Sequence, residues 1–219
     1  MNKVRIFLHI FLTIMVIISI VIAFVVRNSY TRHTDYNDYL LASYCSVTEL
    51  NNLLKEYDAK SFEDIYASAS VVIISEYSGK REIYNENVGY TVNVKSVLKG
   101  DVSEGEDIKI MDFTVFDTES YTVTSLYGNI PLIRGNQYLF LLNEQESHSE
   151  KDTIYYITTQ SPFGKYLIGG DIIIDDGNMK SLKSYDKIAF IASDIQTHSI
   201  YSDFYKKAMG YVENEHFTS

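Results

Sequence analysis

The segment YTVNVKSVLKG, residues 90–100, alternates as a β-strand does and then changes face. Tyr90 and Val94 lie on one side of an extended strand, whereas Val97 lies in the opposite phase. Because successive side chains of a strand point to opposite faces, the apolar side has moved to the other face. A β-bulge, which adds one residue to a strand and increases its bend, produces this shift. We therefore expect a strand that turns a barrel corner at Lys95-Ser96 while it keeps its apolar side chains inside a closed core.

The segment EDIKIMDFTVF, residues 106–116, shifts in the same way. Ile108 and Ile110 share one face, and Met111 and Val115 share the other. A small barrel needs strands that bend, so that one strand pairs in both halves of the sheet. We expect residues 106–116 to form one bent strand of such a barrel. For a strand that changes face, as at Lys95-Ser96, the alternative is a strand that is buried on both faces.

Further strands are predicted by short runs that are rich in apolar and β-branched residues. These runs are residues 70–78, 137–143, 153–159 and 171–175, together with KYLI at 165–168. Asp176-Gly177 after the run 171–175 is a hairpin signal. Five to seven short strands, two of which change face, predict a mainly β protein. The fold class that fits is a small OB-like β-barrel with flanking helices, and a β-sandwich is the alternative.

Helices are predicted before and after the strands. Ser46 with Glu49 and Ser61 with Asp64 are capping-box patterns, which mark the starts of helices. Apolar residues at helical spacing predict two more helices, at residues 185–195 and 202–212. The predicted order of the body is a stalk with a short helix at 27–60, the barrel at 61–182 and a helical C-terminal extension at 183–219.

Residues 6–26 form a run of 21 residues without Asp, Glu, Lys or Arg. As an α-helix this run is about 32 Å long, which matches the hydrocarbon core of a bilayer. We expect an uncleaved, single-pass transmembrane helix, because the apolar core of a secretory signal is only about 7–15 residues long. Lys3 and Arg5 precede the run, so the positive-inside rule favours a cytoplasmic N-terminus and an extracellular C-terminal domain. The alternative is a protein that is secreted after signal cleavage.

Several segments within residues 61–182 occur in an order that resembles a known family. They are SFEDIYASASVVIISEYS, GYTVNVKSVLKG, EGEDIKI, PLIRGNQYLFLL and GKYLI. A short helix and an apolar strand precede a strand that closes on Lys99-Gly100, and Gly135 and Tyr138 then lead into another apolar strand. This order is similar to the small secreted or membrane-anchored domains of Gram-positive bacteria. The resemblance implies an OB-like barrel, distantly similar to netrin-type and metalloprotease-inhibitor barrels, and it implies no activity.

The composition argues against several kinds of site. The residues after the apolar run carry 17 basic and 29 acidic side chains, so binding to a nucleic-acid backbone is not expected. The five histidines are scattered and Cys45 is the single cysteine, so the sequence contains no motif for a metal or a cofactor. Glu104, Glu106 and Asp107 come nearest to a catalytic acid pair, and a solvated turn is the alternative. No catalytic residue is therefore assigned.

The connection DTESYTVTSLYGNIP, residues 117–131, is long for a barrel loop. Tyr with Ser, Thr and Asn is a composition that suits adaptable recognition surfaces, and long loops on a rigid barrel often carry binding functions. We expect Tyr121, Tyr127 and Asn129 to contact a ligand. The alternative is an additional hairpin in which residues 121–126 form an edge strand.

These observations favour a non-enzymatic binding or accessory module at the bacterial cell surface. The membrane would be bound through residues 6–26, and the ligand would be a protein, a peptide or a wall glycan. Two alternatives remain open on the sequence. One is a hydrolase, or an inhibitor of hydrolases, that acts on envelope polymers, and the other is a structural subunit of a membrane complex.

Overall fold

The structure is a computed structural model that describes residues 2–32, 36–83, 88–112, 114–117, 119–145, 154–157 and 162–216. The chain forms two compact units, Met1–Asp38 and Tyr39–Ser219. In the first unit, α1 is a helix over Asn2–Arg32. Among the described residues, no helix is long and apolar enough to cross a membrane.

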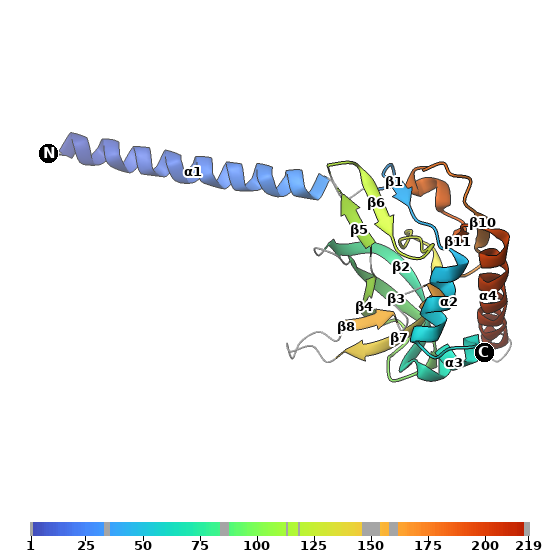
Figure 1. The fold of residues 1–219 in the computed structure, drawn as a ribbon. Coiled ribbons are helices and arrows are strands. Elements are labelled where there is room, and N and C mark those ends of the chain that lie inside the picture. Colours follow the sequence, from blue (N-terminus) through green and yellow to red (C-terminus); the bar gives the residue numbers. More distant parts are fainter. Residues whose placement is uncertain are drawn as a thin grey trace. The chain divides into compact units, whose positions relative to one another are not determined.

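Five strands of the second unit close into a barrel (Figure 1). They are β2 (Val71–Ile83), β3 (Val88–Lys99), β4 (Asp107–Asp112), β7 (Gln137–Gln145) and β8 (Ile154–Ile157). They pair in the order β2-β3-β4-β8-β7, and β7 pairs again with β2, which closes the ring. The β4–β8 pair is parallel and the other four pairs are antiparallel. The predicted mainly β fold with a small barrel is therefore confirmed.

The change of face in β3 is a β-bulge, as the alternation predicts. Ile74 of β2 pairs with Ser96 and Ser75 pairs with Val94, so Lys95 is the extra residue. Val94 before the bulge and Val97 after it both pack on the barrel core. A second register shift, between Val72 and Ile73 of β2, leaves Leu98 unpaired and packed against the helices. The extra residue thus keeps the apolar side chains of β3 inside the barrel while the strand bends.

The prediction of one bent strand over residues 106–116 is wrong. Strand β4 ends at Asp112, and β5 (Thr114–Asp117) belongs to a second sheet with the strand order β1-β6-β5. The other strands of that sheet are β1 (Leu40–Ala42) and β6 (Thr122–Ser125). The change of face therefore reflects a chain that moves from one sheet to another. Because β5 and β6 pair antiparallel, the additional hairpin of the alternative is confirmed. The edge strand expected at residues 121–126 is wrong, because β6 lies between β1 and β5.

The helix predicted for residues 185–195 is also wrong. Strand β11 (Ile188–Ala192) occupies most of it, after a short 3-10 helix, η2 (Leu182–Tyr185). Four of the five residues of β11 are buried, and an apolar run buried on both faces fits helical and strand spacing equally well. β11 pairs in parallel with β10 (Asp171–Ile174), so the hairpin expected at Asp176-Gly177 does not form with the residues that follow the turn. Strand β9 (Lys165–Leu167) pairs with β7.

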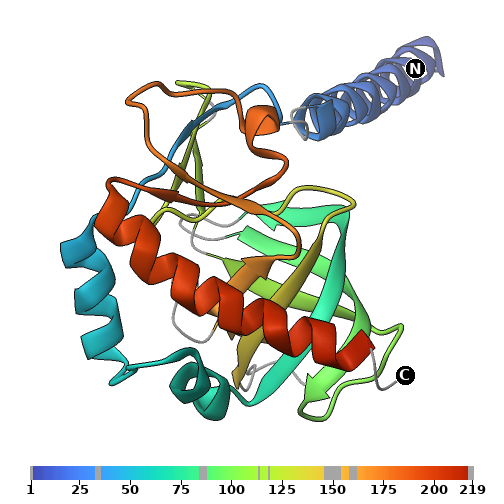
Figure 2. The same cartoon turned by 90° about the vertical axis from the view of Figure 1, so that its right-hand side faces the viewer.

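Three helices pack on the barrel: α2 (Val47–Glu56), α3 (Phe62–Ser68) and α4 (Ile195–His216). Both predicted capping boxes are present, and the carboxylates of Glu49 and Asp64 accept hydrogen bonds from the backbone N–H groups of Ser46 and Ser61 at 2.8 and 2.9 Å. Figure 2 shows α4 running across the barrel, with α2 and α3 beside it. The predicted helix at 202–212 is confirmed as part of α4.

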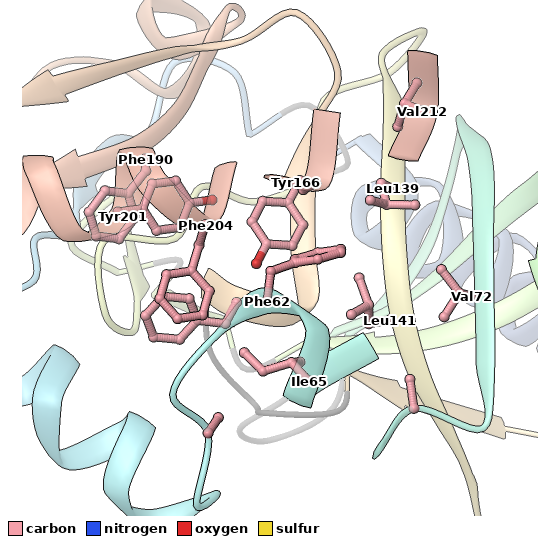
Figure 3. Packing of buried hydrophobic residues seen from close by; sticks show 14 of the residues in the cluster. Phe62, Ile65, Val72, Leu139, Leu141, Tyr166, Phe190, Tyr201, Phe204 and Val212 are labelled. Carbon is pink, nitrogen blue, oxygen red and sulfur yellow. The ribbon is translucent and has the colours of Figure 1, made fainter. Parts of the chain in front are cut away.

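Two apolar clusters hold this unit together. The barrel core fills the barrel with inward side chains such as Ile73, Val92 and Phe140. The helix-side cluster packs the outward side chains of β2 and β7 against the helices, β9 and β11 (Figure 3). At its centre the rings of Phe190 and Tyr201 stack with centroids 3.9 Å apart, which joins β11 to α4.

We predict that Phe190→Ala lowers the free energy of unfolding by about 3–5 kcal/mol, because it removes a fully buried ring from a close-packed cluster. Urea unfolding of the full chain in detergent micelles, followed by near-UV circular dichroism, measures this. Ile195→Ala is the control, because Ile195 is 72% exposed and its removal should change stability by about 0.5 kcal/mol or less. A loss below about 1 kcal/mol for Phe190→Ala would contradict the packing of α4 on β11.

Candidate functional site

The structure separates the three residues that the sequence predicts as a binding loop. Tyr121 is 57% exposed, and its ring meets Tyr39 edge-on with centroids 5.4 Å apart. Tyr127 is half-buried against the helix-side cluster. Asn129 is buried, and its carbonyl oxygen accepts a hydrogen bond from Ser43 Oγ at 2.7 Å. A surface ligand can therefore reach Tyr121 directly, and the binding role of all three residues stays a prediction.

A buried ion pair joins the end of β4 to the start of β9. Lys165 Nζ donates to Asp112 Oδ2 at 2.5 Å and to the carbonyl oxygen of Ile130 at 2.9 Å. Both charged side chains are only 4% exposed. A substrate has no access to groups this enclosed, so we interpret the pair as structural.

The tyrosines near this pair are held in their protonated form. Burial, with a smaller contribution from the Asp112 carboxylate, raises the pKa of Tyr90 well above its usual value. Burial likewise raises the pKa of Tyr138, although a hydrogen bond from the backbone N–H of Ile133 at 2.9 Å opposes the shift. Neither phenol can act as a general base at neutral pH.

The single thiol is inert as well. Cys45 is fully buried, and burial first, then the nearby charges of Glu49 and Asp194, raise its pKa to about 12. A thiol that stays protonated is neither a nucleophile nor a metal ligand. In the part of the chain that the structure describes, no cluster of three or more His, Cys, Asp or Glu side chains is placed to hold a metal ion.

The acidic residues within 104–107, at the start of β4, shape a turn. Glu106 accepts a hydrogen bond from the backbone N–H of Ser103 at 3.0 Å, and Asp107 accepts one from the side-chain amide of Asn93 at 3.0 Å. Glu104 is exposed beside them. This arrangement is that of a solvated turn, which was the alternative to a catalytic acid pair.

A different surface on the barrel has the composition of a binding site. On β2 and β7 the outward side chains, such as Val72 and Leu139, are covered by the helix-side cluster. On β3, β4 and β8 the outward side chains form what we call the outer barrel face. Its members are Gly89, Thr91, Lys109, Met111, Asn143, Ile154 and Tyr156, with Asn143 contributed by the end of β7.

One row of this outer barrel face crosses four strands at about 4.8 Å per strand. Gly89 pairs with Met111, Met111 with Tyr156, and Tyr156 with Asn143. Met111 is buried yet belongs to neither apolar cluster, and Tyr156 is half-exposed beside it. Because Gly89 has no side chain, the row has an aromatic ring and a thioether at its centre and an amide at one end.

The next row of the outer barrel face is more polar. Lys109 is paired with Ile154 and with Thr91 across the sheet, and its Nζ donates to Glu82 at 2.8 Å. An aromatic platform flanked by amide, hydroxyl and ammonium groups can stack on a flat ligand and hydrogen-bond to its edges. The sequence TIYYITT already indicates that Ile154 and Tyr156 share one face of a strand, because side chains alternate. It does not show that this face is the outer one, because the outward face of a strand is known only once its neighbours are known.

Comparison with other proteins does not add a function. The sequence matches no protein-family model and no curated protein.

We predict that Lys165→Met lowers the free energy of unfolding by about 3–5 kcal/mol, because it leaves the Asp112 carboxylate buried without its counter-ion. The double variant Asp112→Leu with Lys165→Met should recover most of this loss, because an apolar pair replaces the ion pair. Urea unfolding of the three proteins measures both values. A single variant as stable as the unmodified chain would show that the pair is not formed.

Proposed function

We propose that this protein is a membrane-anchored, extracellular binding module without catalytic activity, and that its ligand is a neutral glycan of the cell wall held on the outer barrel face. The observation that carries the proposal is the half-exposed Tyr156 with Met111 beneath the same surface, flanked by Asn143 and Thr91. We retain the kinship with the Gram-positive barrel domains as part of this proposal.

The strand order supports an OB-like barrel. The first barrel strand, β2, pairs with the second and the fourth, and the third and fifth strands, β4 and β8, pair in parallel. In OB-folds the face formed by the second and third strands, with neighbouring loops, binds oligonucleotides and oligosaccharides. In this chain those strands are β3 and β4, which carry most of the outer barrel face.

The negative net charge of the chain argues against anionic ligands. The chain has a formal net charge of −10 at pH 7, which disfavours nucleic acids and anionic wall polymers at long range. Within the outer barrel face, the ammonium group of Lys109 is already paired with Glu82. A neutral sugar chain needs an aromatic ring to stack on and amide or hydroxyl groups to bond to, which Tyr156, Asn143 and Thr91 supply.

The anchor is part of the same proposal and rests on the sequence alone. Residues 6–26 carry no charged side chain, and the basic residues before them favour a cytoplasmic N-terminus. This orientation would place the barrel where a wall glycan is available.

We expect the full chain in detergent micelles to bind chitotetraose, a neutral tetramer of β-1,4-linked N-acetylglucosamine, in isothermal titration calorimetry. Tyr156→Ala should weaken binding about tenfold, which corresponds to about 1.4 kcal/mol for the lost ring contact. Tyr156→Phe keeps the ring and should stay within about twofold.

Tyr121→Ala is the matched control, because Tyr121 is the exposed tyrosine of the hairpin that the sequence singles out. It should leave the affinity unchanged. If Tyr121→Ala weakens binding and Tyr156→Ala does not, the ligand lies on the hairpin. If the unmodified chain does not bind the sugar, the neutral-glycan proposal is wrong.

We also expect the full chain to stay in the membrane fraction after extraction with alkaline carbonate. Protease added outside intact protoplasts should digest the barrel and leave a short N-terminal fragment inside the membrane. Release into the supernatant, or a mature N-terminus that begins after residue 26, would show instead that the segment is cleaved and the protein secreted.

A further inference from the structure

The second unit has a groove between the start of α3 and the middle of α4, which we call the α3–α4 groove. Its volume is about 280 Å³. It is lined by Lys60, Ser61, Phe62, Glu63, Ile200, Asp203, Phe204 and Lys207. The volume is slightly below the range of about 300–1,000 Å³ that is typical for drug-sized ligands, so the groove suits a smaller molecule.

The floor of the α3–α4 groove is apolar and rigid. Phe62 from α3 and Phe204 from α4 are both buried and belong to the helix-side cluster (Figure 3). Ile200 and Phe204 are four residues apart in α4, so they lie on the same face of the helix, as do Asp203 and Lys207. The side chains of the floor are therefore fixed by packing before any ligand arrives.

The rim of the groove carries charges of both signs. Lys207 Nζ and Glu63 Oε1 form an ion pair at 3.2 Å that joins the two helices. The pKa of Glu63 is lowered by its own backbone N–H and by Lys207, so this carboxylate stays ionised at neutral pH. A glycoside hydrolase needs one carboxyl group that is still protonated, and Glu63 cannot supply it.

The other two charged groups of the rim are Lys60 and Asp203. No salt bridge to another described residue is formed by either of them. Lys60 uses its backbone N–H to bond the Asp64 carboxylate at 2.8 Å, and its charge also interacts with that carboxylate, but its ammonium group forms no hydrogen bond or salt bridge to another described residue. The groove thus offers one cation and one anion at the edges of an apolar floor.

We propose that the α3–α4 groove binds a small zwitterion with an apolar side chain, of the size of an amino acid or a dipeptide. Lys60 contacts its carboxylate, Asp203 contacts its ammonium group, and the rings of Phe62 and Phe204 hold its side chain. The proposal does not depend on the glycan site, because none of these residues belongs to the outer barrel face.

The test uses the full chain in lipid nanodiscs and isothermal titration calorimetry. The probes are leucine, the dipeptide Ala-Leu, the N-acetylated dipeptide, which lacks the ammonium group, and the dipeptide amide, which lacks the carboxylate. Leucine and Ala-Leu distinguish a free amino acid from a peptide as the ligand. We expect at least one of these two zwitterions to bind about tenfold more tightly than both blocked dipeptides.

Two variants test which side chain binds each charged group of the ligand. Lys60→Gln should weaken binding of the zwitterion about three- to tenfold and leave binding of the amide unchanged. Asp203→Asn should show the same loss for the zwitterion and leave binding of the N-acetylated dipeptide unchanged. Lys206→Gln is the matched control, since Lys206 is an exposed lysine of α4 outside the groove. Circular dichroism melts show whether each variant is folded.

The proposal is overturned if neither zwitterion binds at 10 mM, a concentration chosen as roughly ten times a weak Kd of about 1 mM. It is also overturned if both blocked dipeptides bind as well as the zwitterions, or if folded Lys60→Gln and Asp203→Asn bind like the unmodified chain. Loss of glycan binding in Tyr156→Ala with unchanged zwitterion binding would confirm that the two sites are separate.

Discussion

Strand β2 is the element on which the rest of the structure depends. It pairs with β3 along one edge and with β7 along the other, so it closes the barrel. It is also buried on both faces, since Ile73 faces the barrel core and Ile74 the helix-side cluster. If a strand that is buried on both faces slips by one residue, each of its side chains moves into the opposite core. Ile73 and Ile74 are both isoleucine, so these two side chains alone do not oppose such a slip. The register of β2 is therefore set by its pairing with two neighbours and by the bulge at Lys95, after which Val97 of β3 still faces the barrel core.

The packing around β2 determines which outward side chains of the barrel strands remain exposed to solvent. The helices cover the outward sides of β2 and β7, because those side chains are apolar and must be buried. The outward sides of β3, β4 and β8 carry Thr91, Lys109 and Tyr156, which remain at least partly exposed. Where helix meets helix, between α3 and α4, the apolar floor stays rigid and the charged ends of the side chains form a rim. Both candidate binding surfaces are therefore consequences of how the two apolar clusters divide the barrel.

The features that could be predicted from the sequence are those that a few neighbouring residues determine. The capping boxes at Ser46 and Ser61 need only the serine and the acid three residues later, and both form as expected. The bulge at Lys95 is visible because the apolar phase changes within one strand. The similar change after Ile110 has another cause, since the chain leaves the barrel for a second sheet after Asp112. A change of phase therefore indicates that the chain turns, and it does not distinguish a bulge from a change of sheet.

The features that could not be predicted depend on partners that are distant in the sequence. Residues 188–192 have an apolar pattern that fits a helix, and they form a strand because β10 lies beside them. Lys165 and Asp112 are 53 residues apart, and each looks like a surface residue in its own segment. Nothing local indicates that the two are buried together, because a lysine is normally expected in solvent. The same limit applies to Tyr156, whose neighbours Met111 and Asn143 come from other strands. A binding surface on a barrel is made across strands, so the residues that compose it become recognisable only when the strand order is known.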